Sequence, residues 1–244
     1  MLRRRTDNKT YDPMDSGSQS GSSFTSMSIQ VSVYGPDREC KKFDVNPSYT
    51  YEEVCEAVAE MLEIPPVMFL CCGLCVMDVV HKRFLWLPAT QNDIHSRKEV
   101  YFRIRFLPHE DYIDVLERKY SPCFQYLFYQ LKWDFLHECL SYYTDPDKAS
   151  EARGAGTFLL TNSLRIWAKE NNQDENFKEF YKKYDLNMFL PKCLLKNVFD
   201  RFLVKSPIKD KAHHLLKDKQ LQPEETFKKY FVKILYQKVT STTA

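Results

Sequence analysis

The sequence predicts an α+β fold in which a small mixed sheet with one helix is followed by an all-helical part. The 244 residues are 43% hydrophobic and 28% charged, which is typical of a globular chain. Apolar residues alternate with a period of two, as in strands, only before residue 110. After Pro108 they recur every three to four residues, as in helices. The length suits one or two domains.

The first predicted elements are a hairpin and a helix. Residues 29–34 alternate between apolar and polar side chains, and residues 42–45 form a second short run, so together they predict a β-hairpin. Thr50 and Glu53 have the spacing of a capping box, and apolar residues follow at helical spacing until Pro65. We expect a helix of about 14 residues here.

Three further strands are predicted to complete the sheet. Two apolar runs cover residues 67–80 and 84–87, and residues 100–106 alternate cleanly. The resulting order is ββαβββ. This order within about 80 residues predicts a ubiquitin-like β-grasp roll, in which one helix packs on a mixed sheet.

The last predicted strand has two distinct faces. Alternation places Tyr101 and Arg103 opposite Phe102, Ile104 and Phe106. We expect the apolar face to pack in the core and the other face to contact the helical part. Direct contact with a partner is the alternative for Tyr101 and Arg103.

The helical part is predicted to hold four or five helices in a bundle. Its first long helix has an apolar face made of Phe124, Leu127, Phe128, Leu131, Phe135, Leu136 and Leu140. Residues 155–167 are apolar around most of the helix circumference, which is typical of a central bundle helix. The final helix is expected to open at Pro223, because proline favours the first helical position.

Several features limit the function classes. Residues 1–27 are rich in serine and predict a disordered tail. The six glycines form no phosphate-binding loop. The longest apolar run is shorter than the roughly 20 residues that span a bilayer, and we expect no secretory signal because no apolar segment follows Arg3, Arg4 and Arg5. We therefore expect a cytoplasmic protein whose eight cysteines are reduced.

No metal, cofactor or catalytic site is predicted. Cys72 and Cys75 form a C-x-x-C pair, but no second pair with zinc-ligand spacing follows. His213 and His214 are adjacent, so their rings cannot share one helical face, and we expect surface histidines. No catalytic constellation rises above chance. The chain is therefore expected not to be an enzyme.

One block at the start of the helical part carries a family resemblance. Residues 126–135 read Y-L-F-Y-Q-L-K-W-D-F. This block resembles the Y-L-F-x-Q-x-x-x-D pattern that opens the second lobe of FERM modules. The resemblance implies a ubiquitin-like lobe over residues 28–108 and an acyl-CoA-binding-protein-like helical lobe over residues 109–240. A FERM module also has a third lobe, which we expect to be absent here.

Within FERM proteins, the chain looks most like the N-terminal region of Janus kinases. Three blocks carry this resemblance, namely residues 101–106, 165–173 and 189–193. It implies JAK-STAT-type signalling, with the second lobe holding the membrane-proximal cytoplasmic tail of a cytokine-type receptor. The chain itself contains no H-R-D, D-F-G or V-A-I-K kinase motif.

The strongest charge feature lies near the C-terminus. Residues 192–244 hold twelve Lys and Arg against five Asp and Glu, a net charge of +7. Basic and apolar positions interleave there on two predicted helices, the first of them over residues 206–219 with Ser206-Pro207 as its cap. The predicted contacts with receptor peptide and membrane are Lys205, Ile208, Lys209, Lys211, Leu215, Lys228, Lys229, Tyr230 and Phe231.

Two interpretations of these helices stay open. They could form a groove for a receptor tail beside anionic inner-leaflet lipid, or the lysines could be a solvated face above a bundle core. Nucleic acid is not an expected partner, because the aromatic residues have core spacing and residues 1–191 are acidic in total.

The leading functional hypothesis is a non-catalytic receptor-docking module, peripheral to the inner face of the plasma membrane or an endomembrane. Alternatives are a FERM-type linker between membrane and cytoskeleton, and an N-terminal fragment of an active tyrosine kinase.

Overall fold

The computed structural model describes most of the chain. It covers residues 27–34, 39–45, 48–81, 83–97, 99–106, 109–139, 149–172, 177–195, 198–217 and 224–241. The predicted tail lies outside these residues except for Met27, which begins the first strand. Leu140 and Pro223, used above to predict helices, also lie outside them.

Five strands form one mixed sheet. They are β1 (Met27–Val33), β2 (Glu39–Val45), β3 (Cys72–Asp78), β4 (Arg83–Trp86) and β5 (Glu99–Ile104). Their order across the sheet is β2-β1-β5-β3-β4, with β1 and β5 parallel and the other pairs antiparallel. The predicted hairpin and the ββαβββ order are confirmed, and β5 lies at the centre of the sheet.

The helix α1 (Tyr51–Met61) begins as predicted. Thr50 and Glu53 form a complete capping box, with the Thr50 backbone N–H donating to Glu53 Oε2 at 2.7 Å. The prediction of a strand from residue 67 is wrong for its first residues, because Pro66–Cys71 form the 3₁₀ helix η1. Pro66 stands at its start, where a fixed φ and a missing N–H suit a helical turn.

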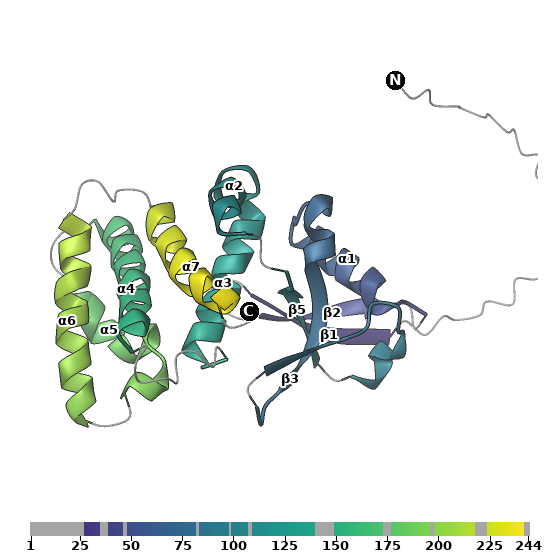
Figure 1. The fold of residues 1–244 in the computed structure, drawn as a ribbon, viewed down its shortest axis with the longest axis horizontal. Coiled ribbons are helices and arrows are strands. Elements are labelled where there is room, and N and C mark those ends of the chain that lie inside the picture. The colour runs from purple at the N-terminus through teal and green to yellow at the C-terminus, as the bar shows by residue number, and fades with distance from the viewer. Residues whose placement is uncertain are drawn as a thin grey trace, which may run out of the picture.

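The remaining helices gather at the other end of the molecule from the sheet and α1 (Figure 1). They are α2 (Ile113–Lys119), α3 (Ser121–Leu136), α4 (Ala149–Asn171), α5 (Lys178–Lys183), α6 (Val198–Lys217) and α7 (Glu224–Ser241). Four short 3₁₀ turns connect elements: η2 (Asp93–Ser96), η3 (Glu110–Tyr112), η6 (Leu186–Phe189) and η7 (Lys192–Leu195). Helix α4 packs against both α6 and α7, and α6 lies farthest from the sheet (Figure 1).

The prediction that Ser206-Pro207 caps a helix is wrong. Helix α6 begins at Val198 and runs through Pro207. An interior proline costs about 3 kcal/mol, since it removes one hydrogen bond and crowds the preceding turn. The burial of Ile208 and Ala212 favours a continuous helix in spite of that cost.

A close backbone contact positions the segment before α6. A Cβ added to Gly156 of α4 would lie 2.8 Å from the Phe189 carbonyl oxygen and would also clash with Leu190. Glycine is therefore required for η6 to approach α4 this closely.

The buried apolar side chains form one continuous core. It runs from Ile29 of β1 through the sheet and α3 to Leu235 of α7. Phe106, predicted to share the buried face of the last strand, is instead 56% exposed, because β5 ends at Ile104 and Phe106 lies beyond the sheet.

Candidate functional site

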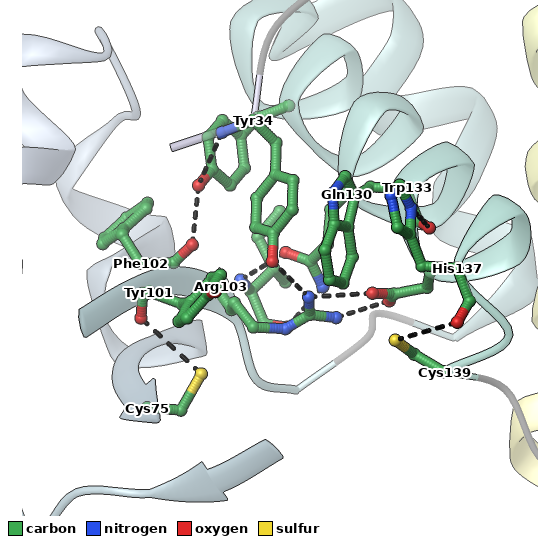
Figure 2. Close-up of polar contacts among 12 residues, drawn as sticks. Tyr34, Cys75, Tyr101, Phe102, Arg103, Gln130, Trp133, His137 and Cys139 are labelled. Atoms are coloured by element: carbon green, nitrogen blue, oxygen red, sulfur yellow. Dashed lines mark hydrogen bonds and ion pairs between the residues drawn. The ribbon is translucent and has the colours of Figure 1, made fainter. Parts of the chain in front are cut away.

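A buried ion pair joins the central strand to the first long helix. Arg103 of β5 is 5% exposed, and its guanidinium forms a two-pronged pair with the carboxylate of Asp134 on α3. The Nη1 atom donates to Asp134 Oδ1 at 2.9 Å and to the Tyr34 hydroxyl at 2.7 Å. Figure 2 shows Arg103 pointing towards Tyr34 and α3. A charge this deeply buried is tolerated only because it is paired.

The environment of the pair holds Arg103 in its charged form. Burial alone would lower the pKa of Arg103, but the facing carboxylate of Asp134 reverses this and raises the pKa overall. Burial raises the pKa of Tyr34 well above its usual range, so its hydroxyl stays protonated. The guanidinium also lies 3.8 Å from the centroid of the Phe84 ring, which adds a cation–π contact.

Gln130 of α3 pairs with the end of β5 as a neighbouring strand would. The Ile104 N–H donates to Gln130 Oε1 at 2.8 Å, and Gln130 Nε2 donates to the Ile104 carbonyl at 3.1 Å. One turn earlier, the Tyr126 hydroxyl donates to the Phe102 carbonyl at 2.7 Å. These bonds satisfy backbone groups that would otherwise be buried without partners.

Aromatic side chains add to these contacts of Arg103, Tyr126 and Gln130 between β5 and α3, which we call the joint. The ring of Trp133 lies 5.8 Å from that of Tyr34, 6.0 Å from Phe84 and 6.3 Å from Tyr101. On its other side it stacks on His137 at 4.2 Å (Figure 2). Trp133 thus ties three segments of the sheet part to α3 in addition to the polar bonds.

The polar members of the FERM-like motif all lie in this joint. Tyr126, Gln130 and Asp134 are spaced four residues apart, so they share one face of α3. They contact Phe102, Ile104 and Arg103 of β5. The expectation that Arg103 contacts the helical part is therefore confirmed. Tyr34 was missed, because nothing in the alternation of β1 indicates a hydroxyl directed at another segment.

The five predicted binding positions on α6 have different surroundings. Ile208 is buried, and Leu215 is half-buried. Lys205 pairs with Asp185 at 3.1 Å, and Lys209 lies 4.2 Å from the Tyr181 ring centroid. Lys211 is exposed.

Of the four predicted positions on α7, Tyr230 is 40% exposed and the other three are buried or half-buried. Lys228 is 6% exposed and donates to Gln125 of α3 at 3.0 Å. Lys229 pairs with Glu117 of α2 at 2.7 Å. Tyr230 stacks on Phe158 at 5.4 Å, and Phe231 is fully buried.

The nine positions therefore lie on two helices that are separated by α4 (Figure 1). The apolar members Ile208 and Phe231 are in the core, as the alternative interpretation of a bundle core requires. Sequence periodicity does not show this, because it cannot say which helix packs on which.

Neither Cys75 nor His213 is fully exposed. Cys75 is buried in β3, and burial raises its pKa to about 12. His213, expected on the surface, is half-buried and lies 3.0 Å from the Tyr181 hydroxyl. Among the described residues, no cluster of histidine, cysteine and carboxylate side chains is arranged to hold a metal ion. The helices in the described ranges include none long and apolar enough for a membrane span.

Comparison with solved structures shows a FERM-like fold. The Dictyostelium discoideum myosin VII MyTH4-FERM MF2 domain matches with a TM-score of 0.62 and 14% identity over 87% of this chain, and a mutant of that domain with 0.61 and 15% over 87%. The complex of the FERM and C-terminal domains of Drosophila Merlin matches with 0.54 and 14% over 86%. At these identities the likeness establishes the fold alone.

The matches cover only part of the solved proteins. This chain spans 41% and 43% of the two myosin VII structures and 65% of the Merlin structure. No protein-family model matches the sequence. No curated protein matches it either.

Proposed function

We propose that the chain is a non-catalytic docking module of FERM type, which binds the cytoplasmic tail of a membrane protein at the inner face of a membrane. The observation that carries this proposal is the FERM-like fold, with its sheet and helices held together by the buried joint of Arg103 and Asp134. In this proposal residues 28–108 are a ubiquitin-like lobe and residues 109–240 an acyl-CoA-binding-protein-like lobe.

A fixed joint suits docking because binding energy is not spent on ordering two mobile parts. The free end of the helical part supplies charge for the membrane. Lys211, His214 and Lys217 are exposed on α6, the helix farthest from the sheet. Each lysine near an anionic surface contributes about 1 kcal/mol, and salt screens this attraction.

The finer proposal is docking on a cytokine-type receptor, as the resemblance to Janus kinases implies. Residues 189–193, one of the resembling blocks, lead through η7 into α6. That arrangement brings the basic helix directly after the block. The second candidate is a membrane–cytoskeleton linker, which is supported by the likeness to a myosin and to Merlin.

Sedimentation with vesicles tests the membrane part of the proposal. We expect the protein to pellet with phosphatidylcholine vesicles that contain phosphatidylserine, and to be released by added salt. The double variant Lys211→Glu/Lys217→Glu should lose most of this binding. Lys119→Glu/Lys169→Glu makes the same charge change at exposed positions on α2 and α4 and should retain it. Equal binding by both variants, or no dependence on phosphatidylserine, would contradict the proposal.

Peptide binding separates the two finer candidates. Immobilised membrane-proximal receptor peptides, each paired with a scrambled version, should retain the protein if it docks on receptor tails. Sedimentation with actin filaments tests the linker. Retention by native and scrambled peptides alike would contradict receptor docking.

A further inference from the structure

An open pocket lies between α1 and the β3–β4 side of the sheet. Its volume is about 160 Å³. Glu52 and Glu56 of α1 and Trp86 of β4 are among the residues that line it. A cavity of about 150 Å³ admits a benzene ring, so this one has room for one aromatic or leucine side chain.

The sheet wall of the pocket is built from flat, stacked groups. A Cβ on Gly73 would lie 3.4 Å from two atoms of the Trp86 ring, so the ring rests directly on the β3 backbone. The Arg105 guanidinium lies 5.5 Å from the centroid of Trp86 and 5.0 Å from that of Phe106. The wall therefore combines the Trp86 ring with the guanidinium of Arg105, which can donate hydrogen bonds.

The mouth of the pocket carries unusually exposed apolar side chains. Leu70 of η1 is 82% exposed, and Phe106 is 56% exposed, and both line the pocket. Large apolar side chains that gather beside a concave site are typical of an interaction surface.

The α1 wall is negatively charged. Glu53 is occupied by the capping box with Thr50. Glu52 and Glu56, one turn apart, are exposed at the pocket and form no ion pair with any described residue. Burial, and after it the negative charges of Glu56 and Glu52, raise the pKa of Cys55 to about 12.

We propose that this pocket binds a peptide segment of a protein partner in which an aromatic or leucine side chain is flanked by lysine or arginine. The apolar side chain would fill the space against Trp86, and the cation would lie beside Glu52 and Glu56. Arg105 would donate to carbonyl groups of the peptide. This inference is independent of the function proposed above, which uses another face of the molecule.

Nuclear magnetic resonance titration tests the proposal with defined probes. The whole ¹⁵N-labelled chain is titrated with acetyl-Lys-Phe-Lys-amide, acetyl-Glu-Phe-Glu-amide and acetyl-Lys-Ser-Lys-amide. The chain has three tryptophans, and loss of one indole signal in Trp86→Phe assigns the indole N–H of Trp86. We expect Lys-Phe-Lys to shift this signal several-fold more than either other peptide at equal concentration.

Charge reversal at the wall provides the decisive comparison. Glu52→Lys/Glu56→Lys should invert the preference, so that Glu-Phe-Glu gives the larger shift. Glu60→Lys/Glu63→Lys makes the same charge change at exposed positions outside the pocket and should leave the preference unchanged. Circular dichroism melts check that both variants are folded.

Three results would overturn the proposal. They are equal shifts from Lys-Phe-Lys and Glu-Phe-Glu, equal shifts from Lys-Phe-Lys and Lys-Ser-Lys, and a preference that survives Glu52→Lys/Glu56→Lys. Shifts that map to α6 would instead place peptide binding on the face that the vesicle experiment probes.

Discussion

The joint between sheet and helices differs sharply from the outer end of the helical part. In the joint, Arg103, Asp134 and Gln130 are buried, and each contacts a partner on the facing segment. On α6, by contrast, Lys211 and Lys217 are exposed. Polar residues therefore have different surroundings in the two regions. Those of the FERM-like motif hold the sheet and the helices together, whereas the cations of α6 face solvent.

The largest expected effect comes from breaking the buried ion pair. Arg103→Met leaves the Asp134 carboxylate buried without its partner, so we expect the free energy of unfolding to fall by about 3–5 kcal/mol. Urea denaturation measures this change. Arg153→Met, at an exposed position on α4, should cost within about 0.5 kcal/mol.

A double variant sharpens this result. Arg103→Met/Asp134→Leu removes both charges, so it should be more stable than Arg103→Met alone. If the free energy of unfolding falls in the double variant by the sum of the losses in Arg103→Met and Asp134→Leu, the two side chains are not coupled. Other contacts would then stabilise the joint.

Removal of the Gln130 amide comes next. Gln130→Ala leaves the N–H and carbonyl of Ile104 without partners, and each buried unpaired group costs about 1–3 kcal/mol. We expect a loss of about 2–4 kcal/mol in the free energy of unfolding. Gln91→Ala, at an exposed position, is the matched control. A loss below about 1 kcal/mol would show that water replaces the amide.

The lysines of α7 and α6 should differ by a smaller amount. Lys229 is half-buried and pairs with Glu117, whereas Lys211 is exposed. We expect Lys229→Met to lower the free energy of unfolding by up to about 1 kcal/mol and Lys211→Met to leave it nearly unchanged. Thermal melts of both variants at low and high salt measure the difference. Equal losses would mean that the α7 lysines behave as an ordinary solvated face.

The smallest effect concerns pH. Burial, with Lys209 and Lys217 nearby, lowers the pKa of His213 below its usual 6.5, although Asp210 acts in the opposite sense. The unfolded chain therefore binds a proton more readily, and this contribution to stability falls as the pH drops below about 6.5. In thermal melts between pH 7.5 and 5.5, the melting temperature of His213→Gln should fall less than that of the unmodified chain. His214→Gln, at the exposed neighbouring position, should match the unmodified chain.

The sequence predicts the local elements better than their packing. The capping box of Thr50 and Glu53 and the hairpin depend on neighbours in the chain, and both are confirmed. The start of α6 was mispredicted because burial of Ile208 outweighs the local effect of Pro207. The surroundings of the predicted binding residues could not be derived from the sequence, because Lys229 pairs with Glu117, more than a hundred residues away, and periodicity carries no information about such a contact.

The three polar side chains of α3 also set a length requirement. Tyr126, Gln130 and Asp134 meet β5 only while the helix keeps its turn of about 3.6 residues between them. One residue inserted after Tyr126 would rotate the later side chains by roughly 100° and detach Gln130 and Asp134 together. A point substitution between residues 126 and 134 removes a single contact with β5. An insertion or deletion there would remove several of these contacts at once.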